Sequence, residues 1–258
     1  MSNPIKEKNI WLVGASTGIG FQLFEDLTAF AKNIIVSSRN TESLENFQSR
    51  YEGSCNIIIA KCDITNVEEV NKQYEFIVKK VGHLDLVILN AAVYEKTDVL
   101  KFNASEYKKQ MMVNYCGSLN VVEPVIKGFI ERKSGQLVVV SSISAIRALP
   151  GAAAYGASKA ALSYFFESLR MHVEELGIKI TIVLPGFVKT RLTEKNDFDM
   201  PLMISPEKAS RIIINGIIAG QDTIDFPKGL TVPIRILRLL PEKWYRRLIQ
   251  KFVMKKEK

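Results

Sequence analysis

The chain has 258 residues, 47% of them apolar and 24% charged, a composition that is ordinary for one globular α/β domain. No apolar run approaches the roughly 20 residues of a membrane-spanning helix, and the polar start does not resemble a signal peptide. The net charge of +8 has one source: residues 228–258 hold ten basic and two acidic residues, and residues 1–227 hold 25 of each sign. A neutral body argues against nucleic-acid binding, which normally spreads basic residues over one face.

Cysteine and histidine residues do not indicate a metal centre. The three cysteines lack metal-like spacing, so we interpret them as free thiols in a reducing, cytoplasmic compartment. His83 and His172 are far apart and neither belongs to a cluster of carboxylates or cysteines. We therefore expect structural or surface histidines and no bound metal.

Short apolar runs alternate with longer amphipathic stretches along residues 1–227. The expected strands are 10–13, 34–37, 57–61, 84–89, 136–141, 179–184 and 223–226. The expected helices are 19–31, 41–51, 67–81, 105–132, 153–176 and 206–219, the last with Ser205 as its cap and Pro206 at its first position. This order predicts a Rossmann-like, doubly wound parallel sheet of about seven strands in a single domain, followed by a C-terminal extension over residues 228–258.

A glycine-rich turn, G-A-S-T-G-I-G at residues 14–20, joins the first expected strand to a helix. Glycines there let the backbone turn tightly and approach a pyrophosphate at the helix N-terminus. The spacing is not the usual GxGxxG. By itself the turn is a moderate signal, and a strand–helix turn without a ligand remains an alternative.

The second expected strand ends where an NAD site usually places an acid to hold the ribose 2′-hydroxyl. This chain has Ser38 there, followed by Arg39. A guanidinium suits a 2′-phosphate, because it forms charge-assisted hydrogen bonds. A plain surface arginine is the alternative, but the missing acid favours NADP(H) over NAD(H).

Tyr155 and Lys159 stand four residues apart in an expected helix, so the phenol and the ammonium project from one face. A nearby ammonium is expected to lower the tyrosine pKa from about 10 toward neutral pH. Such a tyrosine can give a proton to a carbonyl or take one from an alcohol. The pair alone is a weak signal, and Ser142, which follows the fifth expected strand, strengthens it.

With these residues in this order, the chain resembles the short-chain dehydrogenase/reductase family from about residue 9 to residue 226. Further matches are C-D-I-T at 62–65, L-N-A-A at 89–92, M-V-N-Y-C-G at 112–117 and P-G-F-V-K-T at 185–190. The resemblance implies that the catalytic residues are Asn114, Ser142, Tyr155 and Lys159. It implies that the cofactor contacts are Gly14, Ser16, Thr17, Gly18, Ile19, Gly20, Ser38, Arg39, Asp63, Ile64, Asn90, Tyr155, Lys159, Pro185, Gly186, Val188 and Thr190.

The resemblance also implies a mechanism, in which a hydride passes between the nicotinamide and a carbonyl or alcohol. Tyr155 would pass the proton, and Lys159 would lower its pKa and hold the nicotinamide ribose. Ser142 would hydrogen-bond the substrate oxygen, and Asn114 would orient a water that relays protons to Lys159. Family members often assemble through two long helices, here 105–132 and 153–176, so a homodimer or homotetramer is implied by analogy.

One turn departs from the family's pattern, and the role of one further segment has two interpretations. In the turn at 89–92, Leu89 replaces a polar residue and Ala92 a glycine, so we expect altered turn packing with the cofactor retained. Residues 191–204, where the family has its substrate lid, are rich in apolar side chains, and their flexible methionines suit an apolar ligand. A lid that packs its apolar residues on the body is an equal alternative. The apolar residues are Phe198, Met200, Leu202, Met203 and Ile204, and Val93 and Tyr94 are candidates for the opposite wall.

The extension combines apolar and basic residues at helical spacing. Its expected apolar stripe is Trp244, Leu248 and Phe252, with Tyr245, Ile249 and Val253 beside them; Lys243, Arg246, Arg247, Gln250 and Lys251 take the other face. A basic amphipathic helix is typical of peripheral contact with an anionic membrane, here through residues 234–256. Docking on its own domain or on a partner subunit is the alternative, and the charge asymmetry favours the membrane.

Three functions fit these features. The first is an NADP(H)-dependent carbonyl reductase or alcohol dehydrogenase, acting on a small-molecule substrate that is hydrophobic or lipid-like. The second is a non-catalytic NADP(H)-binding sensor or scaffold, which need not keep all four catalytic residues. The third is a reductase of small soluble carbonyls whose extension serves oligomerisation.

Overall fold

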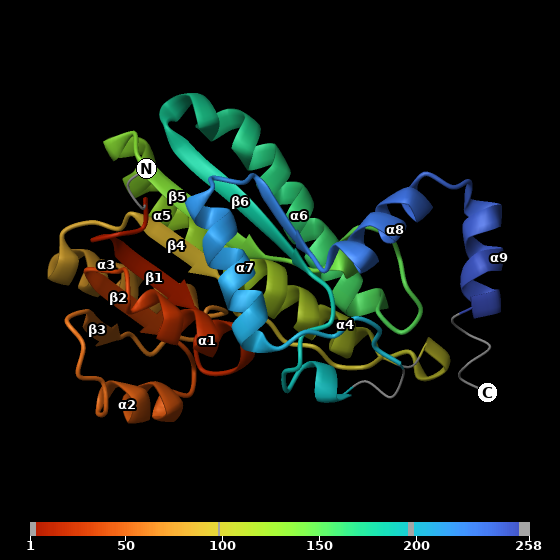
Figure 1. Cartoon of the computed structure of the whole chain (residues 1–258), viewed down its shortest axis with the longest axis horizontal. Coiled ribbons are helices and arrows are strands. Elements are labelled where there is room, and N and C mark those ends of the chain that lie inside the picture. Colours follow the sequence, from red (N-terminus) through yellow and green to blue (C-terminus); the bar gives the residue numbers. More distant parts are fainter. Residues whose placement is uncertain (1–3, 98, 196–198, 253–258) are drawn as a thin grey trace.

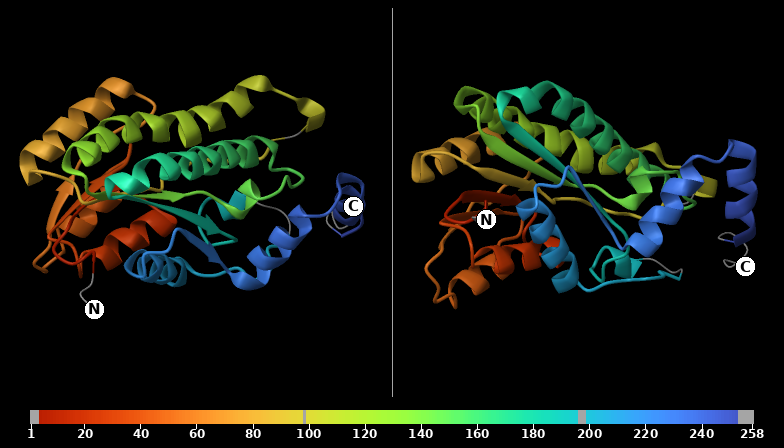
Figure 2. Two further views of the ribbon diagram at one scale, coloured as in Figure 1. Left: turned by 90° about the horizontal axis from the view of Figure 1, so that it is seen from above. Right: turned by 45° about the horizontal axis from the view of Figure 1, so that its top comes forward.

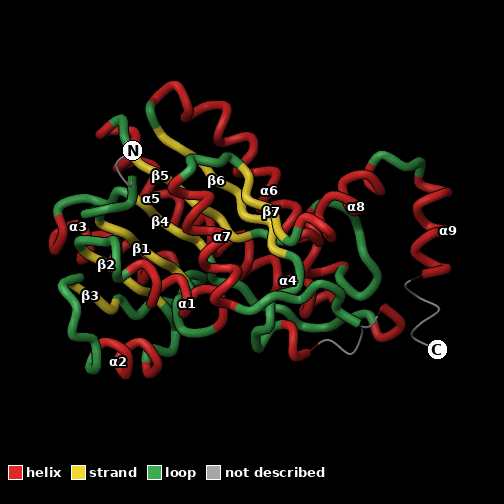
Figure 3. Tube along the Cα trace, viewed as in Figure 1, coloured by secondary structure: helices red, strands yellow, loops and turns green. Residues whose placement is uncertain are grey.

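The computed structural model describes residues 4–97, 99–195 and 199–252. It confirms the predicted fold class, with one parallel sheet in the order β3-β2-β1-β4-β5-β6-β7 running through the middle of the molecule (Figures 1 and 3). The strands are β1 (Asn9–Val13), β2 (Asn33–Ser37), β3 (Asn56–Ile59), β4 (Leu86–Leu89), β5 (Gly135–Val140), β6 (Ile178–Pro185) and β7 (Thr223–Phe226).

Helices cover both faces of the sheet. The helices of the described residues are α1 (Gly18–Leu27), α2 (Glu42–Gln48), α3 (Val67–Val81), α4 (Ala104–Met111), α5 (Gly117–Arg132), α6 (Ala153–Val173), α7 (Pro206–Ile218), α8 (Lys228–Arg238) and α9 (Glu242–Phe252). Helices α8 and α9 lie beyond the sheet, at one end of the molecule (Figure 1). The left view of Figure 2 shows α1 and α7 below the sheet and α3, α5 and α6 above it. The predicted start of α7 is confirmed, because the Ser205 side chain accepts a hydrogen bond from the Lys208 N–H.

The two helical layers enclose two separate cores. Ile10 and Leu12 of β1 point into one core, and Trp11 and Val13 point into the other. All four side chains are at most 2% exposed. This two-sided burial explains why the strands read as continuous apolar runs rather than as alternating ones.

The strand order places β1 between β2 and β4. The chain winds outward from β1 to β3 and then returns past β1 to β4, so the winding reverses at this point. Ligands of doubly wound sheets bind outside the carboxyl ends of the strands at such a reversal. The fold therefore predicts a site formed by the turns that follow β1 and β4.

One predicted helix, 105–132, is interrupted in the structure. A π-helical turn over Met112–Cys116 separates α4 from α5. Asn114 lies in this turn and is completely buried. The extra residue that a π-turn inserts redirects a side chain, and such turns are frequent at functional sites.

Candidate active site

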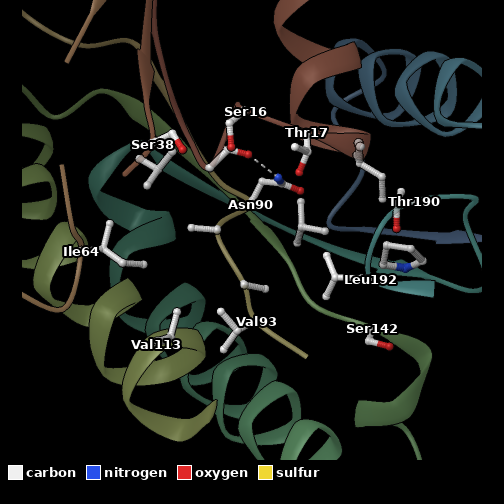
Figure 4. Close-up of a pocket in the computed structure, with 18 of the residues that line it drawn as sticks. Ser16, Thr17, Ser38, Ile64, Asn90, Val93, Val113, Ser142, Thr190 and Leu192 are labelled. Carbon is white, nitrogen blue, oxygen red and sulfur yellow. Dashed lines mark hydrogen bonds between the residues drawn. The ribbon is translucent and has the colours of Figure 1, made fainter. Parts of the chain in front are cut away.

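A cleft of about 220 Å³ lies at the carboxyl ends of β1, β4, β5 and β6. In Figure 4, Ser16, Thr17 and Ser38 lie toward one end, and Ser142 lies toward the other. The residues indicated by the sequence that line it are Gly14, Ser16, Thr17, Gly18, Ile19, Ser38, Arg39, Asp63, Ile64, Asn90, Ser142, Tyr155, Lys159, Pro185, Gly186, Val188 and Thr190. Gly20 and Asn114 do not line the cleft but lie behind it.

The glycine-rich turn is held by contacts that leave no room for side chains. Gly14 has φ +88°, and a Cβ there would lie 2.4 Å from the Ala91 nitrogen. A Cβ on Gly20 would lie 2.0 Å from the Gly14 carbonyl oxygen. That same oxygen accepts a hydrogen bond of 2.7 Å from Asn90 Nδ2 (Figure 4). Gly20 therefore shapes the turn from behind, although it lines no part of the cleft.

The turn after β4, where two residues depart from the family pattern, is hydrogen-bonded to the end of β1. Leu89 is 4% exposed and packs in the core, where a polar side chain would need a partner. The N–H groups of Asn90 and Ala91 both donate to the Val13 carbonyl at 2.9 Å. Ala92 lines the cleft. The expected change in turn packing thus consists of an apolar side chain buried in place of a polar one.

The residues present fit a dinucleotide. The first turn of α1 carries no acidic side chain, so its N–H groups and positive dipole end can meet a pyrophosphate without a competing charge. Gly18 closes the turn against the P-G segment, since a Cβ there would lie 2.8 Å from Thr190 Cγ2. Ser38, Arg39 and Asp63 line the cleft beyond the turn.

Ser142 lies two residues after the end of β5 and caps a short 3₁₀ turn over Ile143–Ala145. Its Oγ accepts a hydrogen bond of 3.1 Å from the Ser144 N–H. The preceding Ser141 is buried and fixes β5 to α6, because its Oγ lies 3.0 Å from the Lys159 carbonyl oxygen and 2.7 Å from Ser163 Oγ. The Ser142 hydroxyl is therefore held at the rim of the cleft by a rigid backbone.

Lys159 is 1% exposed, and its Nζ donates a hydrogen bond of 2.8 Å to the Val140 carbonyl. Burial lowers the pKa of Lys159 to about 7. Burial also raises the pKa of Tyr155 to about 12, and a hydrogen bond with Ser142 acts in the opposite direction. Nζ lies 5.8 Å from the centroid of the Tyr155 ring.

The expected lowering of the Tyr155 pKa is therefore wrong for the protein without its cofactor. The reason is that desolvation has the largest effect on the pKa of the phenol, while Lys159 directs its Nζ at the Val140 carbonyl. Tyr155 is consequently a protonated phenol at neutral pH. Lys159, by contrast, changes its protonation state close to neutral pH.

Asn114 connects three parts of the site from behind the cleft. Its Oδ1 accepts from the Val93 N–H at 2.8 Å, and its Nδ2 donates to the Val93 carbonyl at 3.0 Å and to Ser158 Oγ at 2.9 Å. Ser158 in turn donates to the Tyr155 carbonyl. Asn114 thereby fixes the segment after β4 against the helix that carries Tyr155. That it orients a water which relays protons to Lys159 stays a prediction.

The end of the cleft beside Ser142 and Tyr155, where the sequence predicts the substrate, differs from the expected lid. Val93 lines the cleft, and the Tyr94 ring stands edge-on to Tyr155 with centroids 5.4 Å apart. Of the lid segment, Leu192 and Thr193 reach the cleft, and residues 200–204 do not. Ile204 packs against the core instead, because a bridge to Val188 ties its backbone to the sheet edge. Phe198 lies outside the described residues.

Several lining residues carried no recognisable signal in the sequence. Val113, Leu192 and Thr193 line the cleft, but each is an ordinary residue outside the quoted glycine, tyrosine and lysine patterns. Val113 precedes Asn114 in the π-turn, so the motif around Asn114 was an available clue. Leu192 and Thr193 follow Thr190 directly, so the P-G segment could have been extended to include them.

The comparisons agree with this geometry. A family model described as short chain dehydrogenase matches residues 8–200. An uncharacterized oxidoreductase of Myxococcus xanthus is 32% identical over 89% of this chain and 91% of its own length. The protein 11-beta-hydroxysteroid dehydrogenase-like 3 of Arabidopsis thaliana is 32% identical over 92% of this chain and 79% of its own length.

Solved structures share the fold as well. A short chain dehydrogenase from Burkholderia cenocepacia in complex with NADP has a TM-score of 0.81 and 25% identity, covering 95% of this chain and 98% of that chain. Levodione reductase superposes with a TM-score of 0.80 at 17% identity, over 88% of this chain and 99% of its own, which shows the fold alone. The chain belongs to the short-chain dehydrogenase/reductase family of oxidoreductases.

Proposed function

We propose that this protein is an NADP(H)-dependent oxidoreductase that interconverts a carbonyl and an alcohol. The observation that carries the proposal is that Ser142, Tyr155 and Lys159 line one cleft together with the glycine-rich turn. A nicotinamide cofactor supplies or accepts the hydride when it is bound. The side chains of this chain hold the reactants and move the proton.

Tyr155 is the proton donor in the reductive direction. Because its pKa is raised, the phenol carries its proton at neutral pH and can give it to a substrate oxygen that gains negative charge. Ser142 is placed to donate a hydrogen bond to the same oxygen and to stabilise that charge. Lys159, with a pKa of about 7, can return a proton to this end of the cleft.

Arg39 supports NADP(H) as the preferred cofactor. It lines the cleft beside Ser38, and the residues that directly follow β2 include no acid that could hold a ribose hydroxyl. Within the described ranges Arg39 forms no salt bridge, so its guanidinium is available to a 2′-phosphate. The similar structure from Burkholderia cenocepacia was solved with NADP, which agrees with this choice.

The substrate is hydrophobic in this proposal. Val93, Val113 and Leu192 line the cleft, and Figure 4 shows Leu192 between Thr17 and Ser142, and Val93 beside Val113. The Tyr94 ring adds an aromatic surface against Tyr155. Apolar walls around a few polar groups are what a site for an apolar ketone or alcohol requires.

Replacing the phenol tests the activity. In an assay of NADPH oxidation with a panel of apolar ketones, Tyr155→Phe should lower kcat/KM by roughly 10²- to 10⁴-fold and leave NADPH binding unchanged. Tyr164→Phe is the matched control, since Tyr164 lies on the same helix and is 77% exposed. Tight NADPH binding without turnover of any carbonyl or alcohol would instead favour the non-catalytic sensor.

Replacing the guanidinium tests the cofactor preference. Arg39→Ala should weaken NADPH binding by about tenfold or more, the value of a charge-assisted hydrogen bond, and leave NADH binding unchanged. Arg50→Ala serves as the control, because Arg50 is exposed at the end of α2 and lies outside the cleft. An equal loss for both cofactors would refute recognition of the 2′-phosphate by Arg39.

A further inference from the structure

Helix α8 is apolar on two opposite faces. Thr231 and Ile234 are buried against the body, at 0% and 9% exposure. Val232, Ile236 and Leu239 are 46%, 60% and 83% exposed. Their three- and four-residue spacing puts these three side chains on one side of the helix, which we term the outer α8 face. An exposed apolar stripe on a helix that is already docked needs a second explanation.

Helix α9 divides its apolar residues between the body and the solvent. Tyr245 is 6% exposed, its hydroxyl donates to the Ala148 carbonyl, and its ring lies 4.4 Å from the Arg147 guanidinium carbon. Trp244 and Leu248 remain 60% and 37% exposed. The single stripe expected from the sequence is therefore split: Tyr245 docks on its own domain, and Trp244 and Leu248 stay outside.

The segment 99–102 adds apolar surface at the same end of the molecule. Val99, Leu100 and Phe102 are 64%, 92% and 66% exposed. In Figure 1 and in both views of Figure 2, this yellow-green segment lies at the end of the molecule that carries α8 and α9. Helices α8 and α9 and the segment 99–102, which is distant from them in the sequence, thus present apolar side chains at one end, which we term the apolar end.

The charges of helices α8 and α9 are mostly positive. Residues 228–252 hold seven basic residues and one acidic residue, Glu242. Lys228 and Arg235 pair with Asp225 of the body, and Glu242 is paired with Arg147 at 2.8 Å. The Arg247 guanidinium lies 5.9 Å from the centroid of the exposed Trp244 ring. A two-fold contact with a second copy would bring like charges together, whereas a surface of negative headgroups would neutralise them.

We propose that the apolar end docks on an anionic lipid surface, with the outer α8 face, Trp244 and Leu248 inserted at the level of the headgroups. Contact of this kind is peripheral, because in the described part of the chain no helix is long and apolar enough to cross a bilayer. Apolar side chains bordered by Lys and Arg on short amphipathic helices are the pattern of interfacial binding.

The docked end lies next to the cleft. Helix α8 starts against the P-G segment, since a Cβ on Gly186 would lie 2.9 Å from Leu230 Cδ2. Helix α9 is fastened to Arg147 and Ala148, on the loop that follows Ser142. Docking would therefore bring the substrate end of the cleft to the lipid, from which an apolar substrate could enter. This consequence rests on the proposed function, but the docking itself does not.

The test measures co-sedimentation of the full chain with vesicles of phosphatidylcholine, alone or mixed with phosphatidylglycerol. We expect binding to the anionic vesicles only, and a decrease with added salt. Ile236→Ser with Leu239→Ser should lower the affinity by about tenfold or more. Tyr164→Ser with Met171→Ser is the matched control, because these α6 side chains are 77% and 79% exposed.

A second pair of variants tests the charge. Arg238→Glu with Arg247→Glu should lower binding by at least about fivefold per residue, the value of a basic residue near an anionic surface. Lys72→Glu with Lys79→Glu on α3 should leave it unchanged. Equal binding to neutral and anionic vesicles would overturn the proposal. So would unchanged binding by both double variants of the apolar end, the serine pair and the glutamate pair.

Sedimentation velocity tests whether the apolar end is instead an interface between two copies of the protein. If no vesicle binds the protein, and Ile236→Ser with Leu239→Ser turns a dimer into a monomer, the apolar end is an interface between copies and the lipid proposal is wrong. The vesicle assay needs no turnover, so its failure is distinguishable from a failure of the proposed reaction.

Discussion

Two regions of the molecule are built on opposite principles. One is the apolar end, and the other is the floor of the cleft, by which we mean its lining residues and those directly behind them, such as Asn114. On the floor, Lys159 is 1% exposed and bonded to the Val140 carbonyl, and Asn114 is fully buried and bonded to Val93 and Ser158. At the apolar end, Ile236 and Leu239 are 60% and 83% exposed. A closed network of hydrogen bonds fixes the positions of the side chains, as catalysis requires. Apolar side chains that stay in water can instead stabilise a complex when a binding partner covers them.

The largest loss of stability is expected in the glycine-rich turn, where the backbone contacts are shortest. Gly14→Ala should lower the free energy of unfolding by about 3 kcal/mol or more, because it combines a strained φ with a clash against the Ala91 backbone. Gly82→Ala is a matched control, since its φ is +83° and nothing lies within 4 Å of the added Cβ. That control should cost only about 1 kcal/mol. Urea unfolding of both variants measures the difference, and equal losses would mean that the turn is not tightly packed.

Lys159 should make stability depend on pH. Between a folded pKa of about 7 and the ordinary value of 10.5, the unfolded chain binds a proton that the folded chain does not. Stability should therefore rise with pH across this window, by about 2 kcal/mol between pH 7 and pH 9. Below the folded pKa both states bind the proton, so the slope vanishes.

Lys159→Met removes this contribution while keeping the apolar stem. Urea midpoints of the wild type and the variant, compared at several pH values, isolate the lysine from groups common to both proteins. The difference between the two should grow in favour of the wild type as pH rises. A constant difference would show that the lysine keeps an ordinary pKa in the folded protein.

Two isoleucines on α8 sharpen the comparison within one helix. Ile234→Ala should lower the unfolding free energy by about 2 kcal/mol, because this side chain is 9% exposed. Ile236→Ala should change it by less than about 0.5 kcal/mol, because that side chain is 60% exposed. Thermal unfolding without lipid provides the measurement. A similar loss for both would mean that the outer α8 face is covered by protein in solution.

The smallest effect is expected at the contact that holds α9. Arg147→Lys keeps the charge near Glu242 but loses the stacking of the guanidinium on Tyr245, a contribution of about 1 kcal/mol. Amide hydrogen exchange should become faster in residues 242–252, and exchange in β1 should not change. Unchanged protection of α9 would show that Tyr245 alone holds the helix.

Much of the site could be predicted from the sequence because its residues act through local geometry. Tyr155 and Lys159 share a helix face at any position in a fold. The glycines at 14, 18 and 20 indicate a tight turn, because few other residues permit such a backbone conformation. The position of Asn114 behind the cleft and the contribution of Leu192 could not be predicted, because both depend on how distant segments pack. The direction of the Tyr155 pKa shift was missed for the same reason, since it follows from burial.

The sequence by itself determined the alternation of strands and helices, since short runs of Val and Ile between amphipathic stretches are typical of strands buried on both faces. It also determined the one-sided charge of residues 228–258. Only the tertiary structure decided which apolar side chains of the extension are covered, placing Tyr245 against Ala148 and leaving Ile236 and Leu239 exposed. Helical periodicity shows that a face is apolar, but what covers that face depends on contacts with segments far away in the chain.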